Sequence, residues 1–481
     1  MSIQQELALE RFRQGARSIV TGQQVGFLGG PMYTVCKIAT AVGRVNHHTI
    51  QSVPAAAVFW IEDNDHDLEE AATADLYHRE HGSVRIDARD YSSYRERQSV
   101  ASCCFDDRVL SLGRDIARRV DGDDEGSEDL IRMISSVYVP GRSWSDAFMD
   151  LMQRWFAEHG VLFVKASVIR SMGLMSDVIE RDLNQGDSHA SLVQKSTQAI
   201  VSHGYQAQIT ASGVNSFYHD DHDVRHKINV GESGVTAPNG SGGIIDTDSL
   251  HAMIQSNPER FSPSVVLRPL IQDILLETME FVVGPGELSY MAQLTDLYVH
   301  YGVKMPDLVP RSGVTFLSSR IERLMSKEGH TTEYFLHPWQ DISEQYVKSG
   351  VDASLLQSIE HSRREIALFC NEIHQRSEEF DKSLSGAVGS MKNAMEKELS
   401  NLERKVRTSA KRKQEESLKR AQEIYLFIFP EEKLQERFFV PISLSKVAGE
   451  STVGSVIDIL RIHPTSHHFV LDESALRTTQ S

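Results

Sequence analysis

The sequence predicts an α/β core joined to a long helical coiled coil. From the N-terminus to about residue 320, short apolar runs alternate with helical patterns, which is typical of α/β architecture. From about residue 351 to 424, apolar residues recur every seven residues from Ile359 to Ala387, and no proline interrupts the stretch. A chain of 481 residues is too long for one hydrophobic core, so we expect two or three domains.

The first candidate site is a glycine-rich turn that follows the β-branched run at residues 18–20 and precedes an amphipathic helix. Strand, glycine loop and helix in this order place backbone N–H groups and a helix N-terminus against an anion. The helix carries Lys37 one turn after Tyr33, where an ammonium group can reach a phosphate or a carboxylate. The alternative is a tight turn whose glycines serve packing, because the loop matches neither the Walker pattern nor the dinucleotide fingerprint.

The second candidate site follows a continuous apolar run at residues 53–61. Such a run is typical of a buried parallel strand, and open α/β sheets bind their ligands at the carboxyl ends of the strands. Asp65, His66 and Asp67 come next and can perform acid–base chemistry or hold a divalent cation. The alternative is a solvated acidic loop that caps a helix, but the position after a buried strand favours function.

The third candidate site comes from two segments, residues 261–273 and 281–293. The second segment repeats the order of apolar run, glycine turn and helix, so two turns distant in the sequence could face one cleft. Arg268 is suited to bind a carboxylate or phosphate through two hydrogen bonds, with a structural ion pair as the alternative.

Taken together and in this order, the motifs resemble those of the BshC family, the cysteine-adding enzyme of bacillithiol biosynthesis. The resemblance covers essentially the whole chain, with Asn64 standing where the family usually has Glu. Its motifs here are Thr21-Gly22-Gln23-Gln24, Gly30-Pro31, Tyr33-Thr34, Asp65-His66-Asp67, Leu267-Arg268-Pro269, Gln272-Asp273, Gly284-Pro285-Gly286-Glu287, Tyr290, Gln293, Tyr298, Gly302, Met305-Pro306, Pro310-Arg311 and Leu434-Gln435-Glu436-Arg437.

The resemblance implies a Rossmann-like core similar to nucleotidyltransferases and class I aminoacyl-tRNA synthetases, with a coiled coil used in dimerisation. It also implies a ligase that joins cysteine to the amino group of glucosaminyl-malate, with ATP or ADP as a bound nucleotide. We expect a core at residues 1–345 with inserted segments at about 87–140 and 200–260. A coiled coil at 346–430 and a C-terminal segment at 431–481 that returns to the core complete the expected organisation.

The candidate site residues take their roles from this resemblance. Asp65, His66 and Asp67 are the catalytic candidates, which would position the cysteine amine or act as acid and base. Arg268 would hold the malyl carboxylates, and no metal site is assigned. The expected residues for substrate or nucleotide binding are Gly22, Gln23, Gln24, Gly29, Gly30, Tyr33, Lys37, Arg268, Gln272, Gly284, Gly286, Glu287, Tyr290 and Arg311.

Two other functions stay open at this point. One is an adenylating enzyme or nucleotidyltransferase that acts on another small substrate. The other is a non-catalytic coiled-coil scaffold. The polar residues after the apolar runs argue against the scaffold, because a scaffold has no need to gather Asp65, His66 and Asp67 near a glycine turn.

Composition excludes several classes of protein. A net charge of −17 disfavours nucleic acid as a partner. The acidic, polar start predicts no signal peptide, and no apolar stretch approaches the length of a membrane span, so we expect a cytoplasmic protein. Four cysteines in so long a chain give neither a disulfide framework nor zinc-site spacing.

Two further patterns concern local structure. Residues 161–164, 205–209, 215–218 and 264–267 are expected to form strands. His219, His222 and His226, interleaved with aspartates, look like metal ligands, but a polar hairpin turn is the simpler account.

Overall fold

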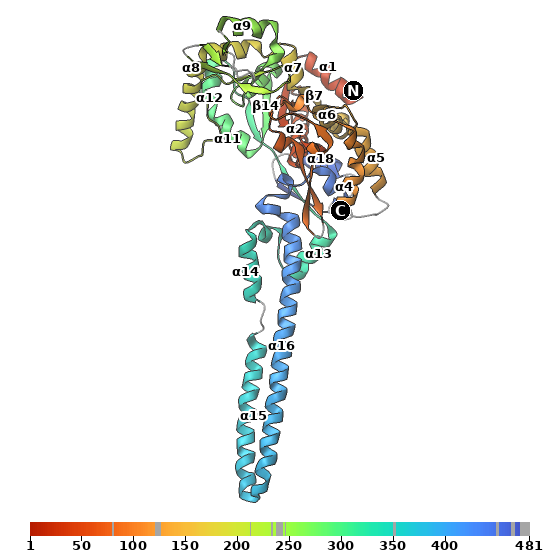
Figure 1. The fold of residues 1–481 in the computed structure, drawn as a ribbon, viewed down its shortest axis with the longest axis vertical. Coiled ribbons are helices and arrows are strands. Elements are labelled where there is room, and N and C mark those ends of the chain that lie inside the picture. The colour runs from red at the N-terminus through yellow and green to blue at the C-terminus, as the bar shows by residue number, and fades with distance from the viewer. Residues whose placement is uncertain are drawn as a thin grey trace. The chain divides into compact units, whose positions relative to one another are not determined.

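The computed structural model describes residues 1–78, 81–120, 127–211, 213–231, 234–236, 244–245, 247–349, 353–448, 452–462 and 467–471. It divides into two compact units, Met1–Ser318 with Lys433–Ser481, and Ser319–Glu432 (Figure 1). The second unit begins before residue 346, where the sequence analysis starts the coiled coil. The reason is that α13 (Ser319–Glu328) and α14 (Trp339–Ser349) both pack against α16 (Ser385–Ile428).

The first unit is built on a five-stranded parallel sheet, which confirms the predicted α/β class. Its strands lie in the order β15-β14-β1-β2-β7, so the order reverses between β14 and β1. The strands are β1 (Arg17–Gln24), β2 (Ala55–Glu62), β7 (Leu162–Lys165), β14 (Thr278–Val283) and β15 (Asp307–Pro310). A reversal of this kind is the switch point at which doubly wound sheets bind their ligands.

The other elements of the first unit cover the sheet or form inserted segments. The helix α18 packs on α2, so residues 452–462 return to the core (Figure 1). The helices are α1 (Ile3–Arg13), α2 (Tyr33–Ile50), α3 (Leu68–Ala72), α4 (Leu112–Val120), α5 (Ser127–Val137), α6 (Trp144–Phe156), α7 (Ala166–Ser171), α8 (Ser176–Ser202), α9 (Thr247–Ser256), α10 (Arg268–Leu276), α11 (Pro285–Gln293), α12 (Thr295–Tyr301), α17 (Pro441–Ala448) and α18 (Thr452–Ile462). The short strands are β3 (Thr73–His78), β4 (Gly82–Asp87), β5 (Ser92–Ser93), β6 (Cys104–Phe105), β8 (Ser216–His219), β9 (Arg225–Lys227), β10 (Asn229–Gly231), β11 (Gly234–Thr236), β12 (Ile244–Ile245), β13 (Phe261–Pro263), β16 (Gly313–Leu317) and β17 (His467–Leu471).

Several local predictions are confirmed and others are wrong. Residues 161–164 coincide with most of β7, and residues 215–218 with most of β8, which pairs antiparallel with β13 and β9. The histidine-rich segment is therefore a hairpin, as the simpler account expected. The first glycine turn begins later than predicted, because residues 21–24 continue β1 in register with residues 59–62 of β2.

Two predicted strands do not form. Residues 264–267 make a turn instead, since the backbone N–H groups of Leu267 and Arg268 both donate to the carbonyl of Ser264. Residues 205–209 pair with no strand. The side chain of Gln293 accepts hydrogen bonds from the N–H groups of residues 208 and 209, at 2.7 and 3.0 Å, and so occupies the place of a partner strand.

The second unit contains a helical hairpin, which confirms the predicted coiled-coil pattern. The helices α15 (Ala353–Phe380) and α16 lie side by side and antiparallel (Figure 1). The heptad pattern stops at Phe380, where Asp381 caps the turn by accepting a hydrogen bond from the N–H of Ser383. None of the helices described here is both long and apolar enough to cross a membrane.

Candidate active site at the switch point of the sheet

A cavity of about 360 Å³ lies at the carboxyl ends of β1 and β14, at the switch point. The second glycine turn contributes to its wall, together with residues 22–24 at the end of β1 and Tyr33 and Lys37 of α2, whereas residues 25–32 of the first turn do not line it. The wall consists of Gly22, Gln23, Gln24, Tyr33, Lys37, Glu62, Asp65, Arg225, Pro263, Ser264, Val265, Arg268, Gly284, Pro285, Gly286, Glu287, Tyr290, Arg311 and Arg437.

Most of the candidate residues line this cavity, and five do not: Gly29, Gly30, His66, Asp67 and Gln272. Gly29 serves packing, because a Cβ there would lie 2.9 Å from the ring of Trp155 and its φ is +93°. Asp67 caps α3 by accepting from the N–H of Glu70, which is the bland alternative for that residue. His66 lies beside the cavity residue Asp65, and Gln272 lies behind Arg268.

Lys37 is held by groups at the end of β1 and by Glu287, which follows the second glycine turn. Its Nζ lies 2.6 Å from Oε2 of Glu287 and 3.1 Å from Oε1 of Gln23, and it also donates to the carbonyl of Gly22. Burial lowers the pKa of Lys37, and the carboxylate of Glu287 opposes that effect. Glu287 also accepts from the N–H of Gly284, at 2.8 Å. The ion pair between Lys37 and Glu287 therefore connects α2 to the second glycine turn.

Arg268 is the first residue of α10 and presents its guanidinium group to the cavity. It donates to the hydroxyl of Tyr290 at 2.6 Å and to Oε1 of Gln272 at 3.1 Å. Burial lowers the pKa of Arg268, but the acidic groups of Tyr290 and Glu62 outweigh it, so the pKa is raised. Burial also raises the pKa of Tyr290 to about 12, so its hydroxyl stays protonated at neutral pH.

Asp65 is an ionised carboxylate of the same cavity wall. Its Oδ1 lies 3.2 Å from Nη1 of Arg225 and accepts from the backbone N–H of His66 at 2.7 Å, while Gln24 donates to its other oxygen. Burial raises the pKa of Asp65, but these donors lower it by more, so the pKa lies well below its usual range.

The C-terminal segment completes the cavity. Glu436 lies 2.7 Å from Nη1 of Arg311, with both side chains buried, and it also accepts from the N–H of Val314 at 2.7 Å. The next residue, Arg437, lines the cavity itself. A segment more than a hundred residues beyond β15 therefore supplies one cation and fixes another.

The sequence analysis assigned no role to three charged residues of the wall, Glu62, Arg225 and Arg437. Glu62 ends β2, so the rule that ligands bind at the carboxyl ends of strands could have found it. Arg225 lies within the histidine-rich segment, directly before His226, and reaches the cavity only through the β8–β9 hairpin. Arg437 belongs to the last motif of the family resemblance, residues 434–437, to which no function was assigned.

The charges of the wall suit a ligand that carries both carboxylates and an ammonium group. Five cationic side chains face three carboxylates, and they come from segments spread over most of the first unit. Among the residues that the structure describes, no group of three or more His, Cys, Asp or Glu side chains is placed to hold a metal ion.

Comparisons with known proteins agree with the resemblance. Residues 2–312 match the model "Bacillithiol biosynthesis BshC, N-terminal Rossmann-like domain", and residues 314–471 match "Bacillithiol biosynthesis BshC, C-terminal coiled-coil domain". The chain is 28% identical to "Putative cysteine ligase BshC" of Chlorobaculum tepidum, over 98% of this chain and 86% of that protein. A protein of the same name from Salinibacter ruber is 29% identical over 87% of this chain and 76% of its own length. Because the two family models together span most of the sequence, the chain belongs to the BshC family of bacillithiol biosynthesis.

Proposed function

We propose that this protein is a cytoplasmic ligase that joins the carboxyl group of L-cysteine to the amino group of glucosaminyl-malate. Membership of the BshC family supports the class of reaction. The observation that carries the proposal is the cavity itself, which places the ionised Asp65 and the cationic Arg268 on the wall of one site.

The opposite charges of Asp65 and Arg268 assign the two substrates to different groups of the wall. Asp65 stays ionised and binds the ammonium group of cysteine, because a carboxylate with a lowered pKa is a good anchor and a poor base. Arg268 binds the malyl carboxylates, since a guanidinium group forms two parallel hydrogen bonds with a carboxylate. Lys37 is already paired with Glu287, so we give it the role of connecting α2 to the second glycine turn.

The amino group of glucosaminyl-malate must lose a proton in order to attack the cysteine carboxyl carbon. Glu62 lines the cavity, and its burial raises its pKa, although Arg268 partly opposes this. A carboxylate with a raised pKa is a better proton acceptor near neutral pH. We therefore assign the proton transfer to Glu62 rather than to His66, which lies beside the cavity.

Forming the amide bond removes the elements of water, so the cysteine carboxylate needs activation. An adenine nucleotide, when bound, would supply that activation by transferring a phosphoryl or adenylyl group to a carboxylate oxygen of cysteine, so that this oxygen could leave as part of phosphate or AMP. Arg311 and Arg437 fit its phosphates, because both line the cavity and Arg311 is fixed by Glu436. The charge of the wall thus suits a nucleotide as well as the two substrates.

A mass-spectrometric assay tests the proposal. Purified protein is incubated with cysteine and glucosaminyl-malate, with and without ATP, and the joined thiol is detected by its mass. We expect product that depends on ATP and on both substrates. A folded protein that forms no product from these substrates, but turns over ATP with another amine, would favour the adenylating alternative.

A further inference from the structure

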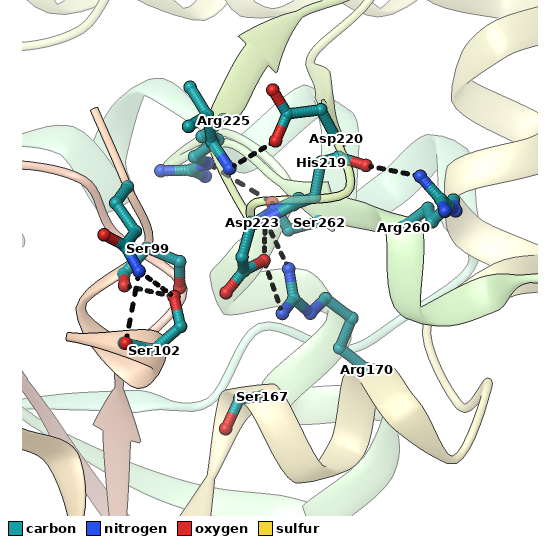
Figure 2. A network of polar contacts seen from close by, with 12 residues as sticks. Ser99, Ser102, Ser167, Arg170, His219, Asp220, Asp223, Arg225, Arg260 and Ser262 are labelled. Carbon is teal, nitrogen blue, oxygen red and sulfur yellow. Dashed lines mark hydrogen bonds and ion pairs between the residues drawn. The ribbon is translucent and has the colours of Figure 1, made fainter. Parts of the chain in front are cut away.

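A buried chain of polar side chains joins the β8–β9 hairpin to β13 and α7 (Figure 2). One member, Arg225, contacts Asp65 on the wall of the cavity. We name this chain the Arg225 relay. Its members come from three strands of the inserted segment and from α7, and they are Arg225 on β9, Ser262 on β13, His219 on β8, Asp223 in the β8–β9 turn and Arg170 on α7. The sequence analysis set this region aside as a polar hairpin.

The relay begins at a guanidinium group that is fixed on every side. Nε of Arg225 donates to Oγ of Ser262 at 3.2 Å, and Nη2 donates to the carbonyl of Pro263 at 2.6 Å. The guanidinium carbon lies 3.9 Å from the centre of the Phe217 ring. The remaining nitrogen, Nη1, is the one that faces Asp65. The position of Asp65 therefore depends on the orientation of Arg225.

The relay continues from Ser262 to His219. Oγ of Ser262 accepts from Arg225, so its own proton is available to His219, whose Nε2 lies 2.7 Å away. Nδ1 of His219 lies 2.6 Å from Oδ1 of Asp223, and a carboxylate oxygen can only accept, so the imidazole proton is on Nδ1. Arg170 closes the chain, because its Nη2 donates to Oδ1 of Asp223 at 3.1 Å. Its Nη1 lies 2.5 Å from Nδ1 of His219, but Nδ1 already donates to Asp223, so this is a close contact and not a hydrogen bond.

The imidazole of His219 is nearly inaccessible to solvent and is neutral at physiological pH. Its side chain is 2% exposed, and burial lowers its pKa to about 4, although Asp223 partly opposes this. A neutral imidazole can accept at one nitrogen while it donates at the other. His219 can therefore link Ser262 to Asp223 without adding a charge beside Arg225.

We propose that His219 is a positioning residue of this site, which acts through Ser262 to orient Arg225 and thereby holds Asp65 in place for an ammonium group. The inference rests on the proposed function, in which Asp65 binds the amino group of cysteine. A positioning role differs from a purely structural one in its effect. A structural network would stabilise the hairpin and would not change the binding of one particular substrate.

Two isosteric substitutions separate these readings. In His219→Gln the amide occupies the place of Nε2 and keeps the contact with Ser262. In His219→Asn the amide occupies the place of Nδ1, keeps the contact with Asp223 and loses Ser262. Each variant keeps one of the two hydrogen bonds, so a purely structural role predicts similar effects of both on melting temperature and activity.

The readout is the KM for each substrate and kcat, measured together with melting temperature. We expect His219→Asn to raise the KM for cysteine about tenfold, the effect of one weakened hydrogen bond between Asp65 and the ammonium group, with the KM for glucosaminyl-malate unchanged. In His219→Gln the KM for cysteine should stay within about threefold of the wild-type value, because the contact with Ser262 is kept. Ser262→Ala should match His219→Asn, and the double variant should show no further loss.

Each outcome has a separate meaning. Gln and Asn variants with equal kinetics, or an increase in KM that affects both substrates alike, would overturn the inference and leave a structural network. A wild-type protein that makes no product and binds no cysteine by calorimetry would instead overturn the proposed function. The inference and the proposed function therefore fail in distinguishable ways.

Discussion

Two carboxyl groups of the cavity, Asp65 and Glu62, have pKa values that are shifted in opposite directions. Asp65 receives hydrogen bonds from Arg225, Gln24 and the backbone, and these lower its pKa. Glu62 receives one hydrogen bond, from Nε1 of Trp60 at 3.0 Å, and burial outweighs it. Different environments thus keep one group ionised and make the other a proton acceptor, the arrangement by which neighbouring carboxylates take different roles.

Replacing Glu62 by Gln tests the role of proton acceptor. We expect Glu62→Gln to lower kcat about 100-fold, the usual loss for a general base, and to leave the KM for cysteine close to that of the wild type. Glu69→Gln, a change at an exposed residue of α3, is the matched control. Steady-state kinetics by mass detection measures both variants, and equal kcat values for Glu62→Gln and the wild type would remove Glu62 from the mechanism.

The same role predicts a pH dependence. Glu62 must be ionised to accept a proton, so kcat/KM of the wild type should fall as the pH falls through the pKa of Glu62. Because burial raises that pKa, the inflection should lie above about 4.3, the usual value for Glu. A pH profile that keeps this inflection in Glu62→Gln would assign it to another group.

At the residue scale, the sequence revealed those site residues that belong to short linear patterns. Such patterns lie next to Asp65, Arg268 and Glu287: an apolar run precedes Asp65, and proline or glycine lies beside the other two. Arg225 and Arg437 carry no such mark, since each reaches the cavity only through tertiary packing of an inserted hairpin or of the C-terminal segment. Pairing over such distances is not encoded in local spacing.

At the scale of elements, the end of β1 lines the cavity, and the glycine turn that follows it serves packing. Gly22 lies on the wall of the cavity, and a Cβ there would come 3.3 Å from the carbonyl of Trp60 and 3.5 Å from Arg268. Gly29 lies under the ring of Trp155 and away from the wall. The packing alternative for the loop is therefore correct for its second half.

A pair of glycine substitutions tests this division. Gly29→Ala should destabilise the first unit by about 2 kcal/mol, because a Cβ meets the Trp155 ring and the positive φ disfavours alanine. Gly389→Ala, within α16, meets no atom and should stabilise that helix by about 0.5–1 kcal/mol. Thermal melting followed by circular dichroism measures both, and an unchanged transition in Gly29→Ala would contradict the packing role.

Elements that the periodicity alone defines were predicted well, and elements that depend on a partner were not. The buried strand β2, the partly buried strand β7 and the helices of the hairpin each carry their own apolar pattern. Residues 205–209 have the composition of a strand, but Gln293 satisfies their N–H groups, and no strand pairs with them. The end of β1 depends on its register with β2, which its own sequence does not show.

At the scale of the whole molecule, the hairpin of α15 and α16 leaves apolar side chains in contact with solvent. Leu368 is 71% exposed, Phe369 50% and Leu402 48%. The resemblance implies a dimer formed through the coiled coil, and these side chains offer a surface that a second copy could cover.

Sedimentation tests this dimer. We expect the wild type to sediment as a dimer at micromolar concentration, and a variant with Leu368→Glu and Phe369→Glu to sediment as a monomer, because charges would be buried at the contact. Gln375→Glu, an exposed change on the same helix, should stay dimeric. A monomeric wild type would refute the expectation.

The central claim of this account is that the cavity between β1 and β14 binds the malyl substrate and is the site of a ligase. The most direct measurement is kcat/KM for glucosaminyl-malate in two matched variants, Arg268→Lys in the cavity and Arg44→Lys outside it. Arg44 also forms a paired contact, since two of its nitrogens lie 2.7 and 2.5 Å from the carboxylate of Glu280. Lysine keeps the charge at both positions but cannot form two parallel hydrogen bonds.

We predict that Arg268→Lys lowers kcat/KM for glucosaminyl-malate at least about tenfold, the effect of one lost charge-assisted hydrogen bond. Arg44→Lys should stay within about twofold of the wild type, because its effect is confined to a pair outside the cavity. Equal losses in the two variants, or an Arg268→Lys variant as active as the wild type, would contradict the placement of the site.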